Sequence, residues 1–163
     1  MEPEDPSVAQ ECVEGYVFAG EPLRLLVLRR PPSRDSIWVP VSGKVEPSDP
    51  DYESALRREI AEETGWGVVQ RLFPLDWEVR FDGPDGRPWR LHAFGVELAS
   101  VSTPRLSGEH VEFEWLAPAE ALERLHYADN RDAVRRLLAR VGAPAVTDTP
   151  SRPMPRLSAS GPS

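Results

Sequence analysis

One predicted helix, near residues 51–65, constrains this chain more than any other feature, because it carries three glutamates beside its apolar stripe. With roughly 100° of rotation per residue, Glu59, Glu62 and Glu63 fall within an arc of about 100°. The apolar stripe consists of Tyr52, Leu56 and Ile60. Glu59 and Glu63 lie beside or within this stripe, where desolvation and mutual repulsion are costly unless a cation neutralises them. We therefore expect a metal-binding carboxylate cluster; the alternative is a solvated acidic face.

The composition narrows the choice of cation and substrate. Cys12 is the only cysteine, so a multi-thiolate metal site within one chain is excluded. Hard oxygen ligands without a complete protein cage suit Mg²⁺, with Mn²⁺ as the alternative, because such ions share their positions with substrate phosphates. The net charge of −8 argues against a general nucleic-acid-binding surface. A small anionic substrate, screened by the cation, fits this balance.

The segment around this helix resembles a known family. Gly43 and residues 58–66, Arg-Glu-Ile-Ala-Glu-Glu-Thr-Gly-Trp, are similar to the Nudix box, whose pattern is Gly, five residues, Glu, seven residues, then Arg-Glu-aliphatic-X-Glu-Glu-X-Gly-aliphatic. The family pattern leaves thirteen residues between its Gly and its Arg, whereas fourteen separate Gly43 from Arg58. The first box Glu therefore falls at Asp49 or Pro50, and Asp49 and Asp51 are both candidates for its role. In the family, that carboxylate braces the loop against the box Arg.

The resemblance also implies a fold and a branch. It spans about residues 12–141 and narrows toward the dihydroneopterin triphosphate and dATP pyrophosphohydrolases. The supporting pieces are Leu28-Arg29-Arg30, residues 38–43, Glu109-His110, Glu114-Trp115-Leu116 and Asn130-Arg131. The implied fold class is α/β (α+β), a Nudix-type α/β/α sandwich with a mixed central sheet. We expect the domain to span residues 11–142, between disordered tails at 1–10 and 143–163 that are rich in proline and polar residues.

Local patterns predict the elements of this domain. Branched and aromatic residues predict a hairpin of 13–18 with 23–28, further strands at 37–41, 68–80, 89–98 and 111–116, and a loop at 42–50. Helices are expected from Asp51 to Gly65, over 118–125, and from an N-cap at Asn130 to Gly142. Cys12 fits a small apolar strand residue.

The resemblance assigns the cation ligands to Glu59, Glu62 and Glu63, with the carbonyl of Gly43 as a further ligand. A general base must also accept a proton. It is a box glutamate or Glu109, for which an exposed loop acid is the equal alternative.

Other residues are candidates for binding roles. Arg58 braces the loop, or is only an i,i+4 partner of Glu62. Arg29 and Arg30 could clamp phosphate or be surface arginines. Trp38 could stack on a base, although tryptophans more often pack in the core. The histidines show no ligand spacing, so no chemistry is assigned to His92, His110 or His126.

These residues together predict an enzyme that cleaves a phosphoanhydride bond in a nucleoside triphosphate or pterin triphosphate by metal-activated water. Alternatives are hydrolysis of ADP-ribose or another nucleoside diphosphate derivative, and a Nudix module that binds a nucleotide without cleaving it. No apolar run approaches the roughly 18 residues of a membrane helix, and the acidic N-terminus is unlike a signal peptide. We expect a cytoplasmic protein without membrane association, and a homodimer is left open.

Overall fold

A seven-stranded mixed sheet forms the centre of the structure, a computed structural model that describes residues 8–84 and 86–142. Its strands are β1 (Gln10–Ala19), β2 (Arg24–Arg29), β3 (Trp38–Val39), β4 (Val41–Lys44), β5 (Arg71–Asp82), β6 (Pro88–Glu97) and β7 (Glu112–Leu116). The expected C-terminal tail and residues 1–7 of the expected N-terminal tail lie outside the described residues.

The strand order places β1 at the middle of the sheet. The main path is β3-β2-β1-β6-β5, while β4 pairs with β1 and β7 pairs with β2. β1 and β6 run parallel, and the other named pairs are antiparallel. The mixed character of the predicted sheet is therefore confirmed, as is the hairpin of β1 and β2.

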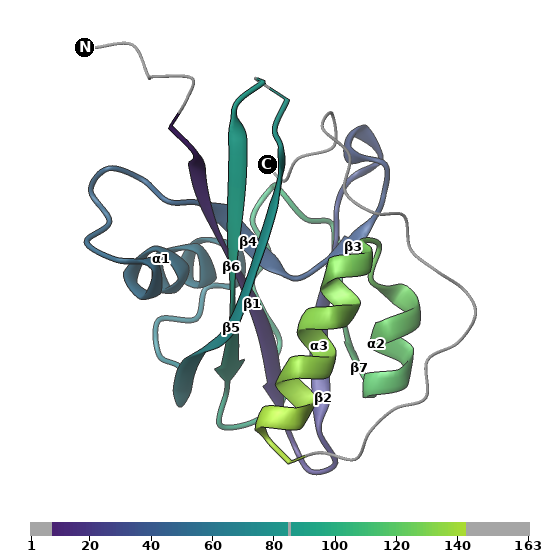
Figure 1. The fold of residues 1–163 in the computed structure, drawn as a ribbon. Coiled ribbons are helices and arrows are strands. Elements are labelled where there is room, and N and C mark those ends of the chain that lie inside the picture. Colours follow the sequence, from purple (N-terminus) through teal and green to yellow (C-terminus); the bar gives the residue numbers. More distant parts are fainter. Residues whose placement is uncertain (1–7, 85, 143–163) are drawn as a thin grey trace.

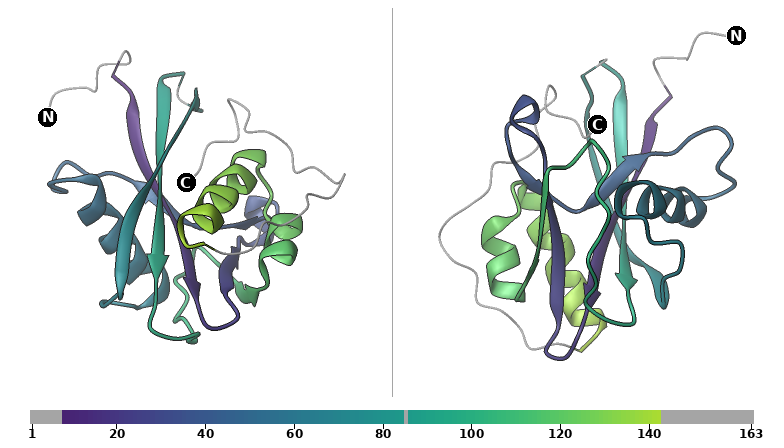
Figure 2. Two further views of the ribbon diagram at one scale, coloured as in Figure 1. Left: turned by 60° about the horizontal axis from the view of Figure 1, so that its bottom comes forward. Right: turned by 180° about the vertical axis from the view of Figure 1, so that it is seen from behind.

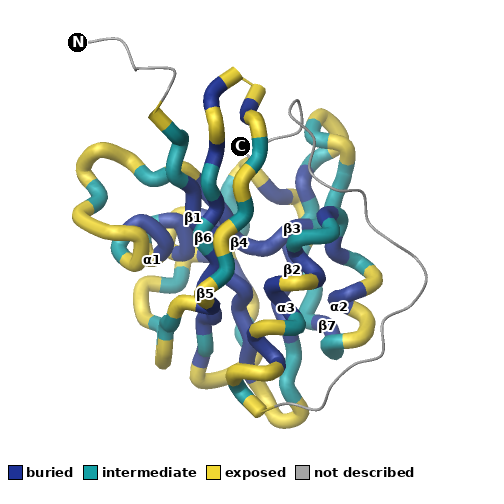
Figure 3. The backbone as a smooth tube through the Cα atoms, viewed as in Figure 1, coloured by how far each residue is buried: buried dark blue, intermediate teal, exposed yellow. Residues whose placement is uncertain are grey.

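Helices cover both faces of the sheet, as Figures 1 and 2 show. α1 (Tyr52–Thr64) packs on one face, where its apolar side chains join the cluster around Val13, Val17 and Val96. α2 (Pro118–Arg124) and α3 (Ala128–Arg140) cover the other face and bury Tyr16, Phe18 and neighbouring residues. A short 3-10 helix, η1 (Pro32–Arg34), follows β2. The predicted α/β/α sandwich is confirmed, and Figure 3 shows the burial concentrated where these layers meet.

α1 begins and ends where the sequence predicts it, and both ends are capped. The side chain of Asp51 accepts a hydrogen bond from the backbone N–H of Ser54 at 2.7 Å, which satisfies one of the free donors of the first turn. Gly65 ends the helix with φ of 80°, a left-handed conformation that favours glycine. These two residues fix the span over which the glutamates can be presented.

Four local predictions were wrong. The loop expected over residues 42–50 begins only after Lys44, because residues 42–44 belong to β4. The single strand expected over residues 37–41 is divided at Pro40, which has no N–H for a sheet, so that β3 pairs with β2 and β4 pairs with β1. The strand expected from residue 68 begins only at Arg71. Asn130 is not the N-cap of the last helix, because α3 begins two residues earlier, at Ala128.

Asn130 is instead a buried link between α3 and the sheet. Its side-chain oxygen accepts from the backbone N–H of Tyr127 at 3.3 Å, and its Nδ2 donates to the hydroxyl of Tyr16 at 2.9 Å. Its amide therefore satisfies a donor at the start of the helix and ties that start to β1.

Of the apolar stripe expected on α1, Leu56 and Ile60 are buried, whereas Tyr52 is exposed. Cys12 is buried in β1 beside Trp89 and Leu91, as expected of a small apolar strand residue. Among the described residues, each helix is too short or too polar to cross a membrane.

Candidate active site

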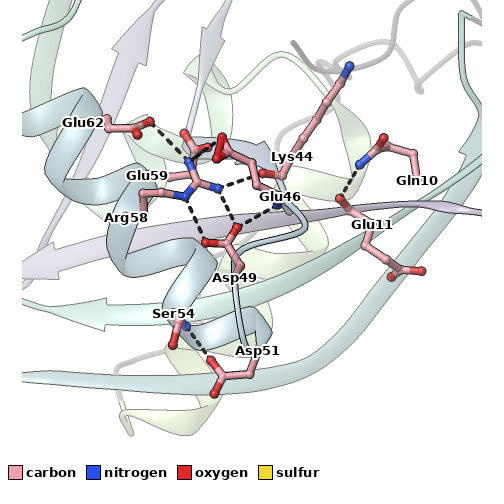
Figure 4. Close-up of polar contacts among 10 residues, drawn as sticks. All are labelled: Gln10, Glu11, Lys44, Glu46, Asp49, Asp51, Ser54, Arg58, Glu59 and Glu62. Atoms are coloured by element: carbon pink, nitrogen blue, oxygen red, sulfur yellow. Dashed lines mark hydrogen bonds and ion pairs between the residues drawn. The ribbon is translucent and has the colours of Figure 1, made fainter. Parts of the chain in front are cut away.

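Arg58 connects α1 to the loop that precedes it, as Figure 4 shows. Its Nε and Nη2 donate to the two carboxylate oxygens of Asp49 at 3.1 and 2.8 Å, and its Nη2 also donates to the carbonyl of Lys44 at 3.1 Å. Its Nη1 donates to Glu59 Oε1 at 2.9 Å and lies 3.4 Å from Glu62 Oε2. Both roles expected of Arg58, the brace of the loop and the i,i+4 partner of Glu62, are thus present.

The geometry separates the two candidate aspartates. Asp49 receives the two-point contact from Arg58 and also accepts the backbone N–H of Glu46 at 2.7 Å. The Arg58 guanidinium lowers the pKa of the Asp49 carboxyl, with the Glu46 amide acting in the same direction. Asp51 instead caps α1. Asp49 is therefore the residue that contacts Arg58 from the loop, and the extra residue lies between Asp49 and Arg58 in the sequence.

Gly43 allows α1 to approach the sheet closely. A β-carbon at this position would stand 2.1 Å from Cδ of Glu59, far inside the contact distance of two carbon atoms. Glycine at 43 therefore creates the space in which the Glu59 carboxylate lies against the backbone of β4. The predicted ligands Gly43 and Glu59 are adjacent in space.

Glu63 is the most deeply buried acid of the helix. It is 1% exposed, and neither carboxylate oxygen has a hydrogen-bond partner among the described residues. Burial raises the pKa of Glu63 to about 10, and the nearby carboxylates of Glu59 and Glu109 act in the same direction. Burial likewise raises the pKa of Glu59. Glu62 differs, because its side chain is 58% exposed.

A second segment completes the site from the other side. The backbone N–H of Val111 donates to the carbonyl of Arg29 at 2.9 Å, which holds the start of β7 beside β2. The two residues before it, Glu109 and His110, come close to Glu63: one ligand atom from each of the three residues lies within 4.8 Å of the others. Glu109, predicted as a candidate base, is exposed, whereas His110 is buried.

His110 is a component of the site for which the sequence predicted no role. Its Nδ1 lies 3.6 Å from Glu63 Oε1 and has no hydrogen-bond partner among the described residues. Burial lowers the pKa of His110 to about 4, and the positive charges of Arg30 and Arg34 add to this shift. The ring is therefore neutral near pH 7. Only its adjacency to Glu109 in the chain could have drawn attention to it.

The donor set fits a divalent cation. Buried carboxylate oxygens are normally hydrogen-bonded, so two orphaned oxygens on Glu63 beside a second buried acid indicate a missing positive partner. Oxygen atoms of Glu59 and Glu63 would hold the cation, whereas Glu62 is exposed and contacts Arg58 at 3.4 Å.

The predicted substrate-binding residues lie at the β2 side of the molecule. Arg29 is paired with Glu112 across β2 and β7, at 2.9 Å. Arg30 is buried, and its charge acts on His110. Trp38 is partly buried against the core, with the guanidinium of Arg124 5.0 Å from the centre of its ring. Of the three, Arg30 is thus the one whose charge acts on His110, the histidine beside Glu63.

Comparison with known proteins identifies the family. The profile of the NUDIX domain matches residues 13–137, most of the chain. The chain therefore belongs to the Nudix family.

Individual relatives differ in what they are named for. An octanoyltransferase of Myxococcus xanthus is 34% identical over 123 residues, which cover 74% of this chain and 34% of that protein, so this chain spans about a third of its length. The dihydroneopterin triphosphate diphosphatase of Haemophilus influenzae is 25% identical over 134 residues, or 75% of this chain and 83% of that protein. The solved structure of an Ap4A hydrolase binary complex from C. elegans superposes with a TM-score of 0.69 at 20% identity, covering 82% of this chain and 98% of that one. Because these names refer to different reactions, the comparisons define the family and the fold.

Proposed function

We propose that this chain is a divalent-cation-dependent pyrophosphohydrolase that cleaves a phosphoanhydride bond in a nucleoside triphosphate or a pterin triphosphate. The observation that carries the proposal is the burial of Glu63, beside Glu59 on the same helix, with two carboxylate oxygens that have no hydrogen-bond partner in the described part of the chain. Buried acids of this kind are ionised at neutral pH only when a cation is bound, and a cation held by few protein ligands keeps positions for phosphate oxygens.

The chain's own residues divide the work of such a site. Glu59 and Glu63 hold the cation against β4, and Gly43 leaves the space that Glu59 needs. Arg58 and Asp49 keep the intervening loop in one position, so that the carboxylates are preorganised. When bound, the cation supplies charge that offsets the phosphate oxygens and lowers the pKa of the attacking water. Glu109, exposed and close to Glu63 and His110, would act as the general base, with a box glutamate as the alternative.

The substrate class rests on two supports. The Haemophilus relative is named for a pterin triphosphate, and the supporting sequence segments resemble the same branch. A triphosphate also presents more than one phosphate to a cation, which matches a site with few protein ligands.

The decisive experiment measures phosphate and pyrophosphate release from a panel of nucleoside triphosphates, dihydroneopterin triphosphate, ADP-ribose and Ap4A. We expect turnover with Mg²⁺ that is strongest on a triphosphate and lost after exhaustive chelation. Preference for ADP-ribose or Ap4A would replace the proposed substrate class. Binding of nucleotides without turnover on any of them would assign a non-catalytic binding module, and undiminished hydrolysis after chelation would reject the mechanism.

The matched control for this assay is Glu53→Gln. Glu53 lies in the first turn of α1, is exposed and pairs only with Arg57 among the ion pairs of the described residues. The loss of one carboxylate from the same helix, away from the cluster, should leave turnover unchanged.

A further inference from the structure

Contacts within α1 do not explain why His110 lies beside Glu63, because His110 belongs to the segment before β7. His110 Nδ1 and Glu63 Oε1 are 3.6 Å apart, and their side chains are 5% and 2% exposed. Neither atom has a hydrogen-bond partner among the described residues. Two facing polar atoms are thus buried together without bonding to each other or to a neighbour.

A hydrogen bond does not account for this separation. Nitrogen-to-oxygen hydrogen bonds are about 2.7–3.2 Å long, so 3.6 Å lies outside that range. Two ligands of one cation, by contrast, each stand about 2.0–2.2 Å from it. Their own separation can then reach about 4.2 Å, and 3.6 Å falls within this limit. The spacing therefore suits two atoms that share a cation better than two atoms that share a proton.

The ring can offer a lone pair at this position. A neutral imidazole has one nitrogen that carries hydrogen and one that accepts, and Nδ1 faces a carboxylate across a buried gap. Backbone structure holds it there, because Val111, the next residue, is bonded to the carbonyl of Arg29. The ligand atom is thus fixed by pairing of β2 with β7 and not by the α1 helix.

We propose that His110 is a nitrogen ligand of the same cation that Glu63 binds, so that the site combines oxygen and imidazole donors and favours cations that accept imidazole, such as Co²⁺, over Mg²⁺. This inference rests on the proposed function, because it concerns the cation of that site. A site with oxygen donors only would favour Mg²⁺, Ca²⁺ or Mn²⁺ without such discrimination.

Pulsed electron paramagnetic resonance with Mn²⁺ as the probe, on the full chain without nucleotide, tests the nitrogen ligand directly. We expect a ¹⁴N coupling of a directly bound imidazole in the wild type, replaced by a ¹⁵N coupling when histidine alone is labelled with ¹⁵N. The labelled wild type requires no substitution, so the test does not depend on a variant that folds. Absence of any nitrogen coupling in the wild type would overturn the proposal.

Two variants, each lacking one histidine, show which residue gives rise to the nitrogen coupling. In His110→Gln we expect the coupling to vanish, and Co²⁺ affinity measured by calorimetry to fall about 10-fold or more while Mg²⁺ affinity changes less. The control His92→Gln removes a partly buried histidine that bonds Glu11 at 2.7 Å, and it should keep the coupling. A coupling that survives in His110→Gln, or an equal loss of Co²⁺ and Mg²⁺ affinity, would contradict the assignment.

The outcomes also separate this inference from the proposed function. Hydrolysis with Mg²⁺ and no nitrogen coupling would support the proposed enzyme activity and reject His110 as a cation ligand. A nitrogen coupling without hydrolysis of any substrate in the panel would support His110 as a cation ligand and reject the proposed enzyme activity.

Discussion

Asp49 and Arg58 meet in a two-point contact, with both carboxylate oxygens of the aspartate bonded to the guanidinium at 2.8 and 3.1 Å. This contact closes the loop between β4 and α1, and through Arg58 it reaches Glu59. The position of Glu59, a proposed cation ligand, is therefore coupled to a residue that does not itself belong to the carboxylate cluster.

The first prediction compares Asp49→Ala with Asp51→Ala. Loss of Asp49 frees the loop and the Arg58 guanidinium, so kcat/KM should fall about 10-fold or more, because small displacements of catalytic groups are costly. Loss of Asp51 removes a helix cap, which should lower the free energy of unfolding and leave kcat/KM nearly unchanged. Steady-state kinetics and urea unfolding measure both. Equal activity of the two variants would contradict the bracing role.

The second prediction concerns the box acids themselves. Glu62→Gln and Glu63→Gln should each lower turnover by about 10²-fold or more, since ligand charge is lost where charge develops in the reaction. The measurement is initial rate at saturating substrate and Mg²⁺, with Glu53→Gln as the control on the same helix. Full activity in Glu63→Gln would show that the cation is bound elsewhere. Full activity in Glu62→Gln alone would restrict the ligands to the two buried acids.

The ends of α1, and the position of the glutamates along it, could be predicted from sequence because each depends on neighbours within one turn or one loop. Asp51 before the apolar stripe and Gly65 after it determine where α1 begins and ends. The choice between Asp49 and Asp51 could not be made by counting, because one extra residue shifts the register and only the direction of Arg58 decides it.

Other features depend on pairings between distant segments. The contact of His110 with Glu63 depends on the pairing of β7 with β2, and no residue spacing within the sequence predicts that pairing. Pro40 in the sequence indicates a break in the strand. The sheet order decides which strands pair with the segments before and after it. Asn130 is suited to a cap by residue type, and its actual bond to Tyr16 arises from packing of α3 on β1.

The third prediction is a pH dependence of the stability of the chelator-treated protein. The folded pKa of Glu63 is raised to about 10 from an ordinary value of 4.5, so the folded state retains a proton that the unfolded state releases. The contribution of this group is fully present below about pH 4.5 and is lost as the pH rises toward 10. Urea unfolding at pH 5, 7 and 9 should therefore show falling stability.

Glu63→Gln removes this titration and supplies its control. Across the same pH range, the loss of stability should be smaller in the variant than in the wild type, and Mg²⁺ should stabilise the wild type more strongly. A wild type and a variant with parallel stability profiles would contradict the assigned pKa shift.

The fourth prediction concerns Glu109. If this residue is the base, Glu109→Gln should lower turnover by about 10²-fold or more with little change in cation affinity, and higher pH should partly restore the rate as hydroxide replaces the missing base. Steady-state kinetics over pH 6–9 measures the change in turnover. The control is Glu120→Gln, which exchanges an exposed residue of α2. Unchanged turnover across that range would return the role to the box acids, and a parallel loss of cation affinity would make Glu109 a ligand.

The two halves of the site depend on contacts of different sequence separation. α1 can form from local contacts, whereas the Glu109–His110 segment reaches Glu63 only through the backbone bond between Val111 and Arg29, far apart in the chain. Contacts of such long sequence separation require costly loop closure and tend to form late. A cation that joins the two halves would then act mainly on the unfolding rate, so the same residues that bind it would also set how long the native state survives.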